Sequence, residues 1–177
     1  MKYMGSKNRI AKEILPIMLA HRTPNQWWVE PFVGGGNMID KVTGNRLGSD
    51  NDKYVIEALI AIRDNLSKLP KNNTEFTEND YKQLRKNDNY IYKGYAGYAF
   101  SYGGKWLGGW CRDGLGKRDY VNESYKNALN QSPLLQGVKF VNESYLDLQI
   151  PDNSLIYCDP PYKGTTKYKN DFNHTVF

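Results

Sequence analysis

The sequence predicts a doubly wound α/β fold in which a parallel sheet is interrupted by a small, mainly helical insertion. Short apolar segments suited to buried strands alternate with helical patterns along residues 1–69, and two more such segments follow after residue 137. Glycine-rich or acidic turns come directly after three of these segments, which is typical of the ligand-binding edge of such sheets. We therefore expect residues 1–69 and 138–177 to form the sheet domain and residues 70–137 to form the insertion.

The elements before the insertion follow from local patterns. Ile10, Ile14 and Ile17 recur at helical spacing, which predicts an amphipathic helix over 7–18, and Ser6 can cap its first turn. Pro24 marks its end. The expected elements that follow are a strand at 27–30, a short helix at 37–42, a strand at 45–50 and a long helix at 51–69.

The insertion and the elements after it are less regular. Residues 70–118 are polar and then rich in glycine and aromatic residues, without a long apolar period, and residues 119–130 predict one more helix. Apolar segments at 138–141 and 155–158 predict two further buried strands. A sheet of about four strands would result.

Composition excludes several classes of protein. The 177 residues are 40% hydrophobic and 24% charged, as in an ordinary globular domain. There is no apolar run of 18 residues and no apolar signal core near the start, so we expect no membrane partner and a cytoplasmic location. Two cysteines exclude a disulfide scaffold, and two isolated histidines give no reason to expect a metal site.

A basic and aromatic stretch lies within the insertion. The formal net charge is +5, and five of the 14 tyrosines fall between residues 90 and 102. The bases interleaved with these aromatic residues are Lys93, Lys105, Arg112, Lys117 and Arg118. Such a mixture suits nucleic acid, because cations hold phosphates and aromatic rings stack on bases. The alternative is that the rings pack a small core, which we expect for at least half of them.

The glycine-rich turn after the first strand has the pattern Phe32-x-Gly34-x-Gly36. Glycines there let the backbone approach a ligand closely, and the following helix start favours electron-rich groups. The turn lacks the third glycine of a dinucleotide fingerprint and the Gly-Lys-Ser/Thr ending of a P-loop. The alternative reading is an ordinary tight turn.

Asp50 stands at the end of the second strand, 14 residues after Gly36. A carboxylate in that place can accept both hydroxyls of a ribose. It could equally cap the helix that begins near Asn51, but a cap does not require the preceding glycine-rich turn. Together, the turn and Asp50 favour a nucleoside-type cofactor.

The sharpest motif is Asp159-Pro160-Pro161-Tyr162, directly after a buried strand. The Asp159 carboxylate and the Pro160 carbonyl provide two acceptors for the two hydrogens of an exocyclic amine, and Tyr162 provides a flat face for a base. Bonds that pull those hydrogens out of the ring plane make the nitrogen more nucleophilic. A structural Pro-Pro turn is the competing interpretation.

In these motifs the chain resembles the N6-adenine DNA methyltransferases, specifically the Dam family. The opening Tyr3-Met4-Gly5-Ser6-Lys7 is similar to that family's aromatic-x-Gly-x-Lys element, and the order of glycine-rich turn, insertion and Asp-Pro-Pro-Tyr matches the α group of amino-methyltransferases. The resemblance covers essentially the whole chain, weakly over residues 70–137. It implies a Rossmann-like methyltransferase sheet, with the insertion as the target-recognition region.

The resemblance also implies S-adenosyl-L-methionine as the cofactor and double-stranded DNA as the partner, with a restriction endonuclease as a candidate partner. The residues that it would place around the cofactor are Tyr3, Lys7, Phe32, Gly34, Gly36, Asp50 and Asp159. Asp159 and Pro160 would hold the amine of a flipped adenine, and Tyr162 would stack on it.

One departure from the family concerns length. The family continues with further strands, whereas 15 residues follow Tyr162 here, so we expect an incomplete sheet in a shortened chain whose activity is open. Two alternatives therefore stand beside an active DNA methyltransferase. One is a DNA-binding remnant without catalysis, and the other is a protein-glutamine methyltransferase, whose family places Asn where Asp159 stands.

Overall fold

A computed structural model describes residues 1–88, 90, 92–163, 172 and 174–175. In this part of the chain a four-stranded parallel sheet forms the centre of the fold. Its strands are β1 (Trp27–Glu30), β2 (Arg46–Ser49), β3 (Val138–Val141) and β4 (Ser154–Ile156). The α/β class is confirmed, and each strand falls at a predicted place, although β4 covers 154–156 rather than 155–158.

The order of the strands is β3-β2-β1-β4, so β1 pairs with β2 on one side and with β4 on the other. Trp28 of β1 lies opposite Arg46 and Leu155. The chain thus builds outward from β1 to β3 and then returns to the opposite side of β1. Such a reversal creates a crevice at the carboxyl ends of the strands, which is where ligands bind in open α/β sheets.

The helices of the sheet domain differ from the prediction at their ends. Helix α1 (Ala11–Leu19) begins four residues later than expected, and Ser6 Oγ instead accepts from Asn8 N in the turn before it. The expected helix at 37–42 is one 3-10 turn, η1 (Ile39–Lys41). The long helix at 51–69 divides at Asn65 into α2 (Lys53–Asp64) and the 3-10 turn η2 (Leu66–Lys68).

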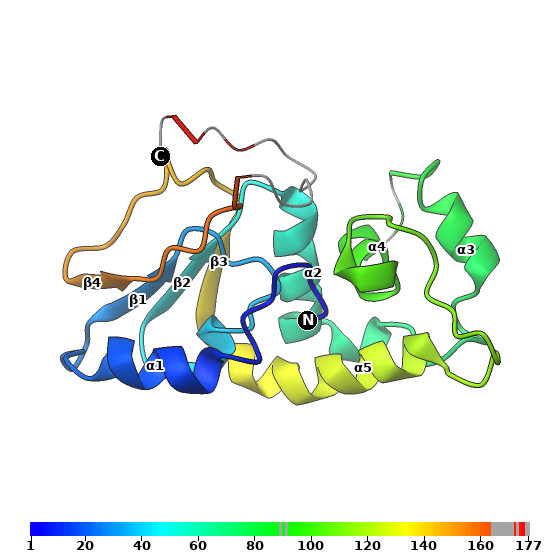
Figure 1. Cartoon of the computed structure of the whole chain (residues 1–177), viewed down its shortest axis with the longest axis horizontal. Coiled ribbons are helices and arrows are strands. Elements are labelled where there is room, and N and C mark those ends of the chain that lie inside the picture. Colours follow the sequence, from blue (N-terminus) through cyan, green and yellow to red (C-terminus); the bar gives the residue numbers. More distant parts are fainter. Residues whose placement is uncertain (89, 91, 164–171, 173, 176–177) are drawn as a thin grey trace.

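The insertion is mainly helical, as expected. It contains α3 (Glu78–Gln83), α4 (Lys93–Ala99), the turn η3 (Tyr102–Gly104) and α5 (Tyr120–Gln131), followed by η4 (Ser132–Leu135). Figure 1 shows the sheet at one end of the molecule, α3 and α4 at the other, α2 between them, and α5 running along one side of both. Asp119 caps α5, because its Oδ1 accepts from Asn122 N at 2.8 Å.

The buried core runs continuously from the sheet into the insertion. Trp28 and Leu59 of the sheet domain belong to the same apolar cluster as Phe76, Tyr95 and Phe100 of the insertion. A smaller cluster, in which Leu148 packs on Val29 and Leu47, covers the other face of the sheet. The insertion is therefore held in position by packing on α2 and has no separate core of its own.

In the described part of the chain, no helix combines the length and the apolar character that a bilayer crossing requires.

Candidate active site

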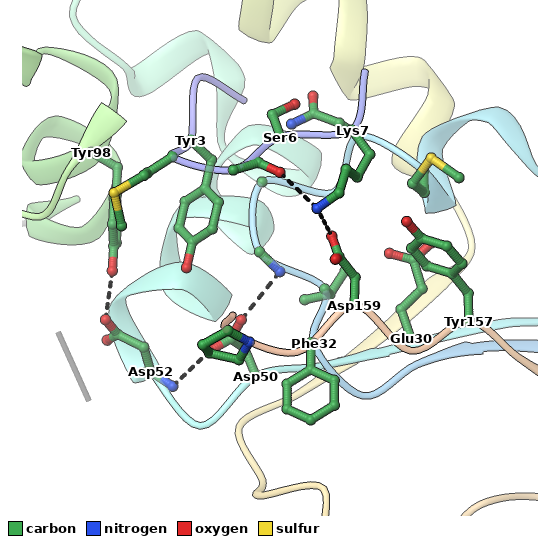
Figure 2. Close-up of a pocket in the computed structure, with 18 of the residues that line it drawn as sticks. Tyr3, Ser6, Lys7, Glu30, Phe32, Asp50, Asp52, Tyr98, Tyr157 and Asp159 are labelled. Carbon is green, nitrogen blue, oxygen red and sulfur yellow. Dashed lines mark hydrogen bonds and ion pairs between the residues drawn. The ribbon is translucent and has the colours of Figure 1, made fainter. Parts of the chain in front are cut away.

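A cavity opens at the carboxyl ends of β1, β2 and β4 (Figure 2). Its walls come from the N-terminal segment, the turn after β1, the start of α2, helix α4 and the segment after β4. The residues singled out from the sequence that line it are Tyr3, Lys7, Phe32, Gly34, Asp50 and Asp159. Three others, Gly36, Pro160 and Tyr162, lie outside this lining although they adjoin it in the chain.

The turn after β1 brings its backbone against Tyr3. Gly34 has φ +48°, and a Cβ on it would lie 2.8 Å from the Tyr3 ring. The Gly34 amide donates to Asp50 Oδ2 at 3.1 Å. The turn is therefore fixed to the end of β2, and its backbone lies so close to the Tyr3 ring that any larger residue at position 34 would clash with it.

Gly36 and Phe32 have different surroundings. Gly36 has φ +67°, and a Cβ there would lie 2.9 Å from Leu59 of α2, so its small size serves packing against the helix. The Phe32 ring lies on the other side of the turn against Tyr145, with 5.2 Å between centroids. Figure 2 shows this ring pointing away from Lys7 and Asp159.

Two carboxylates, Asp50 and Asp52, follow β2 and have different roles. Asp52 is the N-cap of α2, since its Oδ1 accepts from Tyr54 N at 3.0 Å. Asp50 Oδ1 accepts from Asp52 N at 2.9 Å, which closes a turn of the Asx type. Helix capping therefore does not explain Asp50, whose side chain lines the cavity.

Asp159 lies where the segment after β4 meets the N-terminal segment. Its Oδ2 pairs with Lys7 Nζ at 2.5 Å, and its Oδ1 accepts from the Tyr162 hydroxyl at 2.9 Å. Lys7 Nζ also lies 5.0 Å from the centre of the Tyr162 ring and donates to the Gly5 carbonyl. Burial lowers the pKa of Lys7, but the hydrogen bond and charge of Asp159 outweigh it and raise that pKa above its ordinary value.

Glu30 is a buried acid that the sequence reasoning missed. It ends β1, lines the cavity and is 2% exposed, and its Oε1 accepts from Trp28 Nε1 at 2.7 Å. Burial raises the pKa of Glu30 to about 8, against the lowering effect of the Trp28 bond, and the carboxylates of Asp40 and Asp159 raise it further. Its position at the end of a predicted buried strand, just before Pro31 and the glycine-rich turn, was a usable signal, because an acid is almost never fully buried unless it has a partner.

The glycine-rich turn, the carboxylate after β2 and the aromatic N-terminal segment lie within the range of one family model. Residues 3–98 match the D12 class N6 adenine-specific DNA methyltransferases. The chain belongs to this family. It is thus an adenine-specific DNA methyltransferase, in agreement with the resemblance seen in the sequence, and the match favours DNA over protein glutamine as the substrate. No curated protein matches the chain significantly.

The family match takes in Tyr3, Asp50 and Tyr98, whereas Asp159 lies beyond its last residue. The cavity joins Asp159 to the matched residues through the ion pair with Lys7. Among the described residues, no three potential ligands gather in a way that could hold a metal ion.

The five bases singled out for DNA contact differ in exposure. Lys93 is 4% exposed and pairs with Asp88 at 2.7 Å. A lysine buried in this way cannot reach a phosphate, so we no longer count it among the expected DNA-contacting bases. Arg112 pairs with Glu78, and Arg118 pairs with Glu123 at 2.6 Å. The other two, Lys105 and Lys117, are exposed.

The aromatic residues of this stretch are largely structural in the methyltransferase, as expected for at least half of them. Tyr95 and Tyr98 are buried, and Trp106 stacks on Tyr54 of α2 with 4.3 Å between centroids. Tyr102 is the contrast, with 71% of its surface exposed. Tyr98 also lines the cavity, a role that the sequence did not predict because nothing in the local pattern separates it from its neighbours.

Proposed function

We propose that this methyltransferase transfers the methyl group of S-adenosyl-L-methionine to N6 of an adenine that has been flipped out of duplex DNA. The observation that carries the proposal is the shared cavity. Asp159 at the end of β4 lies in the same cavity as Asp50 at the end of β2 and the glycine-rich turn after β1. A cofactor and a nucleobase amine therefore have adjoining places at one sheet edge.

The residues after β1 and β2 fit the cofactor. Asp50 offers a carboxylate for ribose hydroxyls, and Gly34, whose backbone lies against Tyr3, lines the same cavity without a side chain that would project into it. Tyr3 gives the cavity an aromatic wall, and Lys7 fixes Asp159 on the opposite side through their ion pair. When bound, S-adenosyl-L-methionine supplies an electrophilic methyl group.

The residues after β4 fit the adenine amine. Asp159 and the Pro160 carbonyl are acceptors for the two N–H bonds, and Tyr162 offers its ring as a stacking face. In the structure described here both Asp159 oxygens already have donors, Lys7 on Oδ2 and Tyr162 on Oδ1. Because Tyr162 is 57% exposed, its hydroxyl is the donor that can yield Oδ1 to the amine.

Duplex DNA must open for this chemistry, because N6 is paired and stacked inside the helix. The insertion is the element we assign to target recognition, with Lys105 and Lys117 toward phosphates. The work belongs in the cytoplasm, where DNA and cofactor are both present, and a restriction endonuclease acting on the same site is a candidate partner.

The test of the cofactor site is calorimetry with S-adenosyl-L-methionine. Asp50→Ala should weaken binding by about 1.5–3 kcal/mol, the range for hydrogen bonds to a charged acceptor. Unchanged affinity in a folded Asp50→Ala protein would assign Asp50 to the turn alone.

The test of the reaction uses duplex DNA, labelled S-adenosyl-L-methionine and mass analysis of the digested nucleosides. Asp159→Ala should abolish formation of N6-methyldeoxyadenosine while duplex affinity stays within about twofold, since the carboxylate aligns the amine and does not grip phosphates. Methylation by Asp159→Ala near the parent rate would show that another group aligns the amine.

A further inference from the structure

Helix α4 of the insertion reaches into the cofactor cavity through Tyr98. The Tyr98 hydroxyl donates to Asp52 Oδ2 at 2.6 Å, and both residues are buried. Figure 2 shows this bond beside the one between Asp52 and Asp50 and the one between Asp50 and the turn after β1. An unbroken series of hydrogen bonds thus joins Gly34, Asp50, Asp52 and Tyr98.

The backbone of α4 is held closely enough to fix the position of Tyr98. A Cβ on Gly94 would lie 2.2 Å from the Tyr54 carbonyl oxygen of α2, so the two helices touch through bare backbone. The Gly94 amide donates to Glu57 of α2 at 3.1 Å. The Tyr98 ring packs on Tyr3 and Trp106, at 5.3 and 5.0 Å between centroids.

Asp52 receives donors on both of its oxygens. Oδ1 accepts from Tyr54 N and caps α2, while Oδ2 accepts from Tyr98. The backbone amide of Asp52 in turn donates to Asp50, the residue proposed for the ribose. Without Tyr98, Oδ2 would lose its donor from the insertion, and the turn that aims Asp50 would lose its support from α4.

We propose that Tyr98 is a positioning residue that makes the cofactor site a joint product of the sheet domain and the insertion. This rests on the proposed function of Asp50. The consequence is thermodynamic linkage between cofactor binding and DNA binding. Cofactor binding stabilises the arrangement in which α4 holds Asp52, and the same arrangement sets the insertion against duplex DNA, so cofactor and DNA strengthen each other's binding by the same factor.

The structure offers a matched control one helical turn away. Tyr95 lies on the same helix, is equally buried, and its hydroxyl has no hydrogen-bond partner among the described residues. Tyr95→Phe and Tyr98→Phe therefore remove the same atom from the same helix. Tyr98→Phe breaks the bond to Asp52, and Tyr95→Phe breaks none.

The experiment measures two quantities for each protein. One is the affinity for S-adenosylhomocysteine, which cannot react, and the other is duplex affinity with and without that ligand, followed by fluorescence anisotropy. In Tyr98→Phe the ligand should bind about tenfold more weakly, which is the effect of one hydrogen bond to a charged acceptor, and the ligand's enhancement of DNA affinity should fall toward one. Tyr95→Phe should keep both values of the parent.

A second variant guards against misfolding of Tyr98→Phe. Asp52→Asn keeps a good capping residue for α2 but removes the charged acceptor, so it should reproduce the lost enhancement. Lower thermal stability with an unchanged enhancement would make Tyr98 merely structural, and unchanged ligand affinity would also overturn the proposal. A parent chain that binds no S-adenosylhomocysteine would refute the cofactor site itself, an outcome distinct from failure of the Tyr98 variant alone.

Discussion

Glu30 carries the most unusual environment of any acid lining the cavity. An acid whose folded pKa is raised binds its proton more tightly in the folded protein than in the unfolded chain. With a folded pKa of about 8 and an ordinary value of 4.5, Glu30 stays protonated in the folded protein through the neutral range. Between those two values it makes the folded state progressively less stable as pH rises.

The first prediction follows from this sign. Glu30→Gln keeps an acceptor for Trp28 Nε1 and removes the titration, so its advantage in unfolding free energy over the parent should grow from pH 5 to pH 8. We expect a gain of up to about 3 kcal/mol between the two ends. Urea unfolding of both proteins at three pH values measures it.

The quantity to follow is the difference in unfolding free energy between Glu30→Gln and the parent, because a second buried group titrates in the same pH range. The Met1 ammonium donates to the Gly35 carbonyl, and burial lowers its pKa to about 5, which gives a slope of opposite sign. That slope is common to both proteins and cancels. A constant difference across the pH range would mean that Glu30 is ionised in the folded protein.

The individual site residues differ in how far the sequence could predict their positions. The placement of Asp50 and Asp159 in one cavity was predictable because each ends an apolar segment, and the carboxyl ends of parallel strands meet at one edge of the sheet. Lys93 was misplaced because charge pattern does not reveal the burial of one long side chain, which here lies against the Tyr54 ring. Tyr98 depends on the packing of α4 against α2, which no local pattern encodes.

Secondary-structure elements were predictable where one local cause decides them. Strands β1 and β3 fall on the predicted residues, since short apolar segments between polar turns have few alternatives. The start of α1 was not predictable from Ser6, because that hydroxyl closes a separate turn at residues 6–8. The division of the helix at 51–69 comes from the non-helical backbone of Asn65, with φ −128°.

Packing between α2 and α4 gives the second prediction. Gly94→Ala should prevent the helices from touching and destabilise the protein by about 1–3 kcal/mol or more, as overpacking does elsewhere. Gly114→Ala is the control, because a Cβ there would meet no atom within 4 Å and its φ is not positive. Thermal unfolding followed by circular dichroism compares them. Equal midpoints for the two variants would mean that α4 can shift away from α2 at no cost.

The whole molecule presents its proposed DNA-binding surface through the loop that follows η3. After the burial of Lys93 and the ion pairs of Arg112 and Arg118, the exposed lysines Lys105 and Lys117 are the bases of the original five best placed for phosphates. Arg112 is exposed, but its pair with Glu78 offsets part of its charge. The surface is therefore smaller than the sequence suggested.

The third prediction concerns this surface. Replacing Lys105 and Lys117 together by Ala should lower duplex affinity and reduce the slope of log affinity against log salt by about two. The control replaces Lys12 on α1 and Lys139 on β3, which are also exposed and change the net charge equally. If both double variants shift the slope alike, net charge rather than a local contact is responsible.

The continuous core bears on how such enzymes could be recombined. Exchanging residues 70–137 for those of another methyltransferase would part Phe76, Tyr95 and Phe100 from the α2 residues in the same cluster. It would also part Trp106 from Tyr54, on which it stacks. A chimera with altered DNA sequence preference would have to include the face of α2 that packs against the insertion, together with the insertion itself. The part of this chain that would have to be exchanged to change DNA recognition is thus larger than the segment that would contact the DNA.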